Sequence, residues 1–171
     1  MRWAVVGDTG LFGSDLALLL EERGEEVVRF NRSNLDLEES SERIARLIGT
    51  ADVLVNAVGY TQVDKAEQEL NEANTVNAIY AGRLAEVAAL LRAKYFYIST
   101  DYVFDGEAND PYSIKAKTNP QNVYGNSKEL GEQLVTEASA NYTIFRTSWL
   151  YGANGKNFAK SIAAKLMDAG A

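Results

Sequence analysis

Trp3–Ala–Val–Val–Gly–Asp–Thr–Gly–Leu–Phe–Gly13 is the stretch that decides the fold. Its first four residues are wholly apolar, which is typical of a strand buried on both faces of a parallel sheet. Three glycines follow, each three residues after the last, and a helical pattern then runs over Ser14–Arg23. A strand, a glycine-rich turn and a helix in this order are the local context that a dinucleotide-binding fold requires.

The three glycines have separate expected roles. Gly7 lets the chain turn tightly out of the strand, Gly10 lets backbone amides approach a pyrophosphate, and Gly13 lets the helix pack close to the sheet. The spacing is Gly-x-x-Gly-x-x-Gly rather than Gly-x-Gly-x-x-Gly, and an ordinary glycine turn is the alternative. The cofactor contacts predicted from this loop are Gly7, Thr9, Gly10, Leu11, Phe12 and Gly13.

Strand and helix patterns alternate along the rest of the chain. Further strands are predicted over Glu26–Phe30, Asp52–Asn56, Lys94–Ser99 and Asn141–Arg146. Further helices are predicted over Glu38–Gly49, Asn71–Arg92, from Tyr124 onward, and Asn157–Asp168. This alternation predicts an α/β fold, a doubly wound parallel sheet of Rossmann-like type with helices on both faces. With no repeat and no linker, residues 1–171 are expected to form one dinucleotide-binding domain.

The helical patterns also predict which side chains face the core. In the Asn71–Arg92 helix the apolar side is predicted to hold Val76, Ile79, Tyr80, Leu84, Val87 and Leu91. In the helix from Tyr124 it is predicted to hold Leu130, Leu134 and Ala138. Gly131 lies inside that helix, where glycine costs ~1 kcal/mol relative to alanine. We therefore expect another backbone to approach closely at Gly131.

Composition excludes several classes of function. The chain of 171 residues has no cysteine and no histidine, so thiol nucleophiles, thiolate metal sites and histidine-based triads are excluded. The net charge of −7 argues against nucleic-acid and membrane partners. No apolar run approaches ~20 residues and the N-terminus has no signal-peptide pattern. We expect a cytoplasmic protein, and its residues predict no metal site.

Tyr124 and Lys128 are the expected centre of the chemistry. They are four residues apart, so on a helix they share a face and their side chains can meet. A neighbouring cation favours the phenolate and is expected to lower the phenol pKa toward working pH. Such a phenol can donate a proton to a carbonyl oxygen or accept one from an alcohol.

Other candidates follow the predicted strands. Thr100 carries a hydroxyl at a strand's carboxyl end, although a β-branched residue that favours strands is the alternative reading. Ala57 and Gly59 form a small-residue loop after the third strand, where ligands lie in open α/β sheets. After the second strand, Asn31 and Arg32 replace the acidic residue that selects NAD. Arg32 favours NADP(H), with NAD(H) or a solvated arginine as alternatives.

Together these residues resemble the extended short-chain dehydrogenase/reductase superfamily. Four stretches narrow the resemblance to the dTDP-4-dehydrorhamnose reductase family: Val55–Asn–Ala–Val–Gly–Tyr–Thr–Gln–Val–Asp–Lys–Ala–Glu67, Ser99–Thr–Asp–Tyr–Val–Phe104, Asn122–Val–Tyr–Gly–Asn–Ser–Lys128 and Phe145–Arg–Thr–Ser–Trp–Leu–Tyr–Gly152. The resemblance implies NAD(P)H-dependent reduction of the C4 keto group of dTDP-4-dehydro-L-rhamnose. It covers essentially the whole chain.

The resemblance also implies residue roles. Tyr124 would protonate the C4 oxygen, Lys128 would lower the pKa of Tyr124 and bind the nicotinamide ribose, and Thr100 would hydrogen-bond the carbonyl. The sugar pocket would be lined by Asp101, Tyr102 and Trp149. Further cofactor contacts would come from Asp36 and Leu37 near the adenine, and from the loop Ala57, Val58, Gly59, Tyr60 and Thr61.

Family members continue into a C-terminal lobe that completes the sugar-nucleotide site, so this chain is expected to be the cofactor domain without that lobe. A homodimer is a further expectation. Two other functions stay open. One is a sugar-nucleotide dehydratase or epimerase, although Tyr102 stands where dehydratases place a glutamate. The other is a non-catalytic NADP-binding regulatory subunit, like the β subunit of methionine adenosyltransferase.

Overall fold

The sheet of this protein is wholly parallel and has the strand order β2-β1-β3-β4-β5. The computed structural model describes residues 1–139, 141–155 and 157–168. Its strands are β1 Arg2–Val6, β2 Glu26–Phe30, β3 Val53–Asn56, β4 Lys94–Thr100 and β5 Tyr142–Thr147. Each lies within one residue of a predicted strand at both ends. The predicted α/β class and doubly wound parallel sheet are confirmed.

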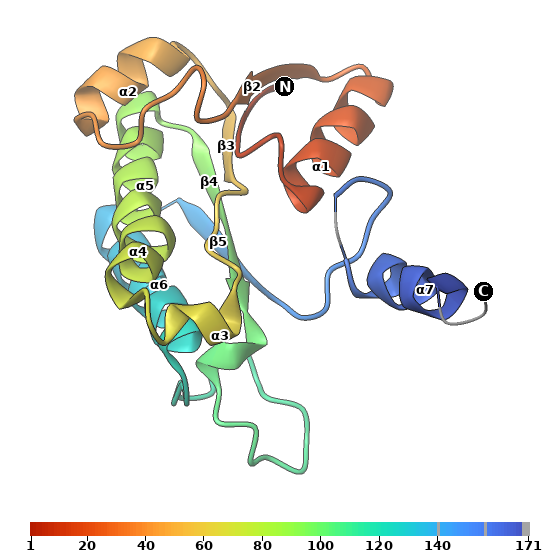
Figure 1. Ribbon diagram of the computed structural model, residues 1–171. Helices are drawn as coiled ribbons and strands as arrows, with labels where there is room; N and C mark the ends of the chain where they lie inside the picture. Colours follow the sequence, from red (N-terminus) through yellow and green to blue (C-terminus); the bar gives the residue numbers. More distant parts are fainter. Residues whose placement is uncertain (140, 156, 169–171) are drawn as a thin grey trace.

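Helices cover both faces of this sheet, as predicted. They are α1 Leu11–Glu22, α2 Ser41–Ile48, α3 Val63–Ala66, α4 Leu70–Asn74, α5 Tyr80–Leu91, α6 Val123–Ala138 and α7 Phe158–Asp168, with a π-helical turn η1 Thr75–Ile79 and a 3-10 turn η2 Asp101–Val103. Helices α2, α4, α5 and α6 lie on one side of the sheet, and α1 and α7 lie on the other (Figure 1). No described helix has the length and apolar character needed to cross a bilayer.

The main core lies between the sheet and helices α2, α5 and α6. Apolar side chains of β1, β3 and β4 meet those of α2 and α5 there. Two tyrosines of β4 are fully buried in this layer, and the hydroxyl of each donates a hydrogen bond to a backbone carbonyl. Tyr95 donates to the carbonyl oxygen of Ala81 at 3.0 Å, and Tyr97 donates to that of Asn77 at 2.7 Å. These bonds tie the central strand to the η1–α5 segment.

The predicted Asn71–Arg92 helix is not uniform. It consists of α4, the π-helical turn η1 and α5, and Arg92 ends it in the left-handed conformation. A π-helical turn contains an extra residue, which rotates the following side chains relative to a regular helix. Val76, Leu84 and Val87 are buried as predicted, but Ile79 is 45% exposed. The predicted inward position of Ile79 is therefore wrong.

The buried face of α6 also differs from the prediction. Leu130, Leu134 and Ala138 are only half-buried. The most buried positions are Gly125, Ser127, Lys128, Gly131, Glu132 and Val135. The reason is that α6 packs its small and polar residues against β4 and η1, while Leu134 contacts α5 at Gly82.

The close approach predicted at Gly131 is confirmed. A Cβ placed on Gly131 would collide with the backbone carbonyl oxygen of Asn77 and would lie 2.5 Å from the hydroxyl of Tyr97. A side chain at this position therefore cannot fit between α6 and η1 without movement of one of them. The glycine holds α6 close enough to place Lys128 beside β4.

Candidate functional site

The candidate site lies where β1 and β3 end, because the strand order reverses between them. Two of the three glycines after β1 are required by the chain itself. Gly7 has φ of +94°, and a Cβ there would lie 2.8 Å from the carbonyl carbon of Ala57. A Cβ on Gly13 would collide with the carbonyl oxygen of Gly7. The predicted tight turn and close helix packing are thus confirmed.

Gly10 differs from its two neighbours. A Cβ there would lie 3.4 Å from the carbonyl oxygen of Gly7, which is ordinary contact, so the fold itself does not require glycine. Gly10 is also the N-cap of α1, with no side-chain cap on the amides and no acidic residue in the first turn of this described helix. A free, positively polarised helix N-terminus of this kind favours an anion.

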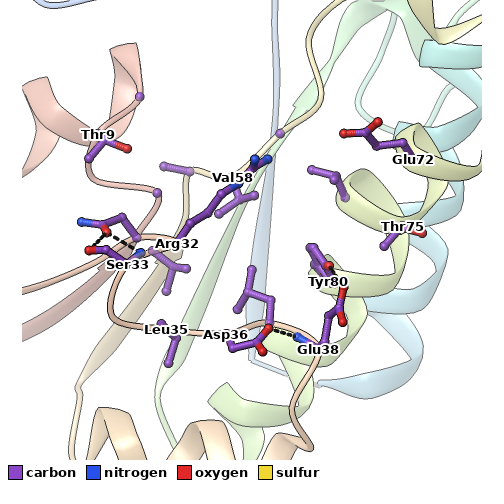
Figure 2. A pocket seen from close by; sticks show the side chains of 18 of the residues that line it. Thr9, Arg32, Ser33, Leu35, Asp36, Glu38, Val58, Glu72, Thr75 and Tyr80 are labelled. Carbon is purple, nitrogen blue, oxygen red and sulfur yellow. Dashed lines mark hydrogen bonds between the residues drawn. The ribbon is translucent and has the colours of Figure 1, made fainter. Parts of the chain in front are cut away.

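A cavity of about 1060 Å³ extends from Gly10 toward η1. Thr9, Ser33 and Leu35 lie on its β1–β2 side, and Glu72, Thr75 and Tyr80 face them from the helical side (Figure 2). The predicted cofactor residues that line it are Gly7, Thr9, Gly10, Asn31, Arg32, Asp36, Leu37, Ala57, Val58 and Gly59. The structure therefore brings together residues from three predicted loops.

The loop after β2 is held in place by Asn31. The Asn31 amide donates to Asp8 Oδ1 at 3.0 Å, and its oxygen accepts from the hydroxyl of Ser33 at 2.6 Å. Arg32 stays exposed, and its side chain extends across the cavity toward Val58 (Figure 2). The cavity thus has a free guanidinium and a hydroxyl at the end of β2, where a ribose 2′-substituent would be recognised.

A second cavity, of about 510 Å³, continues on the other side of Gly10. It shares Thr9, Gly10, Ala57, Val58 and Gly59 with the first. It is further lined by the predicted residues Leu11, Phe12, Thr61, Tyr124 and Lys128. Two cavities that meet at a free helix N-terminus fit a ligand with two ring systems joined by a pyrophosphate.

Lys128 is deeply buried at the floor of the second cavity. The residue is 4% exposed, and its ammonium donates a hydrogen bond to the carbonyl oxygen of Ile98 at 3.0 Å. The ammonium lies 5.0 Å from the centre of the Tyr97 ring, and a Cβ on Gly59 would be 3.3 Å from it. Burial lowers the pKa of Lys128 to about 8, while the charge of Glu132 acts to raise it.

The predicted effect of Lys128 on Tyr124 is wrong for this structure. Burial raises the pKa of Tyr124, a hydrogen bond with Thr100 lowers it in part, and Asp101 and Tyr102 raise it further. The ammonium of Lys128 is directed to a backbone carbonyl of β4 instead of the phenol. Two residues that share a helix face need not bond to each other when a buried carbonyl offers the cation a better partner.

The predicted sugar-binding residues divide into two groups. Thr100, Asp101 and Tyr102 gather beside Tyr124, where Thr100 donates to Asp101 Oδ1 at 3.1 Å and the rings of Tyr102 and Tyr124 are 5.8 Å apart. Trp149 does not join them. It is 72% exposed and packs against Phe158 of α7, with ring centres 5.1 Å apart.

Tyr60 is another predicted residue that lines neither cavity, as are Gly13, Thr100, Asp101 and Tyr102. Its side chain is 7% exposed, and its hydroxyl donates to Glu69 at 2.7 Å. Burial together with this carboxylate raises the pKa of Tyr60 to about 12. The backbone of Tyr60 is held by the side-chain amide of Asn77, which also donates to the hydroxyl of Ser127 at 2.9 Å. Asn77 was not singled out in the sequence.

The residues of the helical wall of the larger cavity were also not predicted as site residues from the sequence. It consists of Asn71, Glu72, Thr75, Val76 and Tyr80. These residues belong to a segment read only as an amphipathic helix, and they reach the cavity because α4 and η1 pack against the loop after β3 at Val58 and Tyr60. Polar residues at the beginning of a long helix that follows a ligand-binding loop are the one signal that pointed to them.

Comparison with known proteins gives one consistent family. Residues 1–170 match the family described as the RmlD substrate binding domain. A dTDP-4-dehydrorhamnose reductase of Sinorhizobium fredii is 43% identical over 164 residues, covering 95% of this chain and 55% of that protein. A dTDP-4-keto-6-deoxy-D-glucose reductase of Streptomyces niveus is 38% identical over 163 residues, covering 94% and 57%.

Among solved structures, a Bacillus anthracis dTDP-4-dehydrorhamnose reductase in complex with NADP superimposes with a TM-score of 0.92 at 35% identity. The match covers 98% of this chain and 60% of that one. The chain thus spans a little more than half the length of the relatives it matches.

Proposed function

The chain belongs to the RmlD substrate binding domain family, and from that premise we propose that residues 1–171 form the NADP(H)-binding domain of a reductase. The reaction would reduce the C4 keto group of dTDP-4-dehydro-L-rhamnose to give dTDP-L-rhamnose. The observation that carries the proposal is the pair of cavities meeting at Gly10 and ending at Tyr124 and Lys128.

The cofactor half of the proposal is supported by the lining of the larger cavity. Its residues offer apolar contacts from Leu35, Val58 and Val76, and a cation from Arg32. A guanidinium can bind a 2′-phosphate through two parallel hydrogen bonds. NADP(H) is therefore proposed over NAD(H), and the B. anthracis relative was solved with NADP.

The catalytic half rests on what the residues at the second cavity can do. Bound NADPH would supply the hydride for the carbonyl carbon. The Tyr124 phenol, kept protonated by burial, then donates its proton to the carbonyl oxygen. Lys128 brings a positive charge to the same cavity and is proposed to bind the ribose of the nicotinamide. Thr100 lies beside Tyr124, and its hydroxyl is proposed to hydrogen-bond the carbonyl oxygen of the substrate.

The substrate is proposed to be a sugar nucleotide, held at the reacting end by Thr100, Asp101 and Tyr102. Trp149 is proposed to reach it only after moving from its contact with Phe158. A homodimer stays a prediction that measurement of mass in solution tests. The two named relatives act on different 4-keto sugars by their names, so the choice of rhamnose precursor depends on the assay below.

Calorimetric titration with NADPH, NADH and the substrate nucleotide tests the cofactor half. We expect NADPH to bind this chain more tightly than NADH. Absence of binding to both would contradict the proposal.

NADPH oxidation in the presence of dTDP-4-dehydro-L-rhamnose tests the reaction in a protein that contains this chain. Cofactor binding without oxidation of NADPH by any 4-keto sugar nucleotide would favour the regulatory-subunit alternative instead.

A further inference from the structure

Glu132 is a buried carboxylate that the proposed reaction does not use. It lies on α6 one turn after Lys128 and two turns after Tyr124, and is 7% exposed. It accepts a hydrogen bond from the hydroxyl of Ser99 at 2.6 Å and two from Arg146, at 2.9 Å from Nε and 2.6 Å from Nη2. A charge taken out of water needs such partners, so this carboxylate is held in one place.

The bonds of Glu132 connect α6 and β4, which carry the reacting groups, with β5. Ser99 precedes Thr100 on β4, and Arg146 precedes Thr147 at the end of β5. Lys128 bonds to the carbonyl oxygen of Ile98, so neighbouring residues of β4 contact successive turns of α6. The cluster therefore fixes how α6 lies along β4.

The two charges of the ion pair differ in their exposure to water. The side chain of Arg146 is 25% exposed and that of Glu132 is 9% exposed. The guanidinium also lies 4.9 Å from the centre of the Phe104 ring. Water screens the charge of Arg146 more than that of Glu132. Arg146 thus cancels only part of the field of Glu132.

Other groups that face the Lys128 amine carry no charge at neutral pH. From β4 there are the Tyr97 ring and the carbonyl of Ile98, and burial raises the pKa of Tyr97. From α6 there is Tyr124, whose pKa is also raised. Around Gly59, where a Cβ would lie 3.3 Å from the Lys128 amine, the other near side chains of the described residues are the uncharged Asn77 and Thr61. Glu132 is the carboxylate among the described residues whose charge acts on Lys128.

We propose that Glu132 is a positioning residue that keeps the Lys128 amine positively charged in its buried place, that Ser99 holds the carboxylate there, and that Arg146 opposes part of its effect. The consequence of this charge rests on the proposed function, in which Lys128 binds the ribose of the bound cofactor. Without the carboxylate, burial alone would favour the neutral amine.

The test measures the charge of Lys128 directly, without cofactor or substrate. The protein is labelled with ¹³C at the lysine Cε positions, and its NMR spectrum is followed from pH 6 to pH 11, with Lys128→Met used to assign the resonance. We expect Glu132→Gln to move the Lys128 titration down by about one pH unit. Arg146→Met removes a competing cation and is expected to move it up.

Opposite shifts are the signature of an electrostatic role, because both substitutions break the same ion pair and both weaken the fold. An unchanged Lys128 titration in Glu132→Gln, or a shift of the same sign in both variants, would overturn the proposal. If Glu132→Gln does not fold, Arg146→Met still decides, because an upward shift supports the proposal and a downward or absent shift overturns it. NADPH titration of the unsubstituted protein tests the proposed function separately. NADPH binding together with an unchanged Lys128 titration in Glu132→Gln would overturn only the proposal for Glu132.

Discussion

Gly131→Ala is the substitution whose effect follows most directly from the packing of α6. The new Cβ would collide with the carbonyl oxygen of Asn77 and would lie 2.5 Å from the hydroxyl and 3.1 Å from Cζ of Tyr97. Neither neighbour is a flexible side-chain end, because one is backbone and the other is a fully buried ring. The helix must therefore move away from η1.

The change in free energy of unfolding combines one stabilising and two destabilising contributions. Alanine is favoured over glycine inside a helix by ~1 kcal/mol. Overpacking of a dense core costs roughly 1–3 kcal/mol. Movement of α6 also strains the hydrogen bond from Tyr97 to Asn77, and an unsatisfied buried hydroxyl costs roughly 1–3 kcal/mol. We expect a net loss in free energy of unfolding of about 2–3 kcal/mol, or roughly 5–10 °C in melting temperature.

Urea unfolding followed by circular dichroism measures this loss. Gln133→Ala, two residues further along α6 and exposed, is the control, expected within about 0.5 kcal/mol of the parent. Because Lys128 lies on the same helix one turn earlier, NADPH affinity should fall in Gly131→Ala and not in the control. A Gly131→Ala protein as stable as the parent would refute the close packing of α6 against η1.

Four further predictions concern the cavities. Tyr124→Phe should leave NADPH affinity within about twofold and lower turnover of the complete enzyme by about 10²–10⁴ in steady-state assays, whereas equal turnover would remove Tyr124 from the mechanism. Gly10→Val should abolish NADPH binding in calorimetry with a stability loss of only about 1 kcal/mol, since the fold tolerates a Cβ there; unchanged affinity would refute the assignment of this loop. Arg32→Ala should weaken NADPH binding and spare NADH, and an equal loss for both would show that Arg32 does not read the 2′-phosphate. Lys128 has a pKa of about 8 in the folded protein against 10.5 as the ordinary value, so the unfolded chain binds more protons between these values and stability rises with pH there. Relative to Lys128→Met, the free energy of unfolding should rise by about 2 kcal/mol from pH 7.5 to 9.5, and parallel pH profiles would contradict the burial of this charge.

Much of the fold could be predicted from local sequence. The strands β1 and β3 are short apolar runs between turn formers, so their type and bounds are visible without tertiary information. Gly131 was also informative, because a residue that disfavours a helix interior needs a reason from outside the helix. In each of these cases the local preference and the tertiary packing agree.

The remainder depends on contacts that no local pattern contains. The π-helical turn η1 is stabilised by packing against α6 and by the bond from Tyr97, and it displaces Ile79 from the predicted apolar stripe. The buried face of α6 consists of small and polar residues because β4 and η1 lie against it. A search for apolar periodicity therefore selected Leu134 in place of Glu132.

In the site, too, some features follow from local sequence and others depend on tertiary contacts. The glycine loop and the loop at Gly59 were predicted from their place after strands, and both line the cavities. The direction of the Tyr124 pKa was missed, because burial and the partner chosen by Lys128 depend on β4. Thr75 and Tyr80 reach the cavity only through the packing of η1, which the sequence spacing does not reveal.

A crystal structure of the chain with NADPH tests the central claim most directly. The account predicts the adenosine in the cavity between Arg32 and Tyr80, the pyrophosphate at the N-terminus of α1, and the nicotinamide in contact with Tyr124 and Lys128. A nicotinamide ring bound away from the Tyr124 hydroxyl, or a pyrophosphate away from the N-terminus of α1, would contradict it.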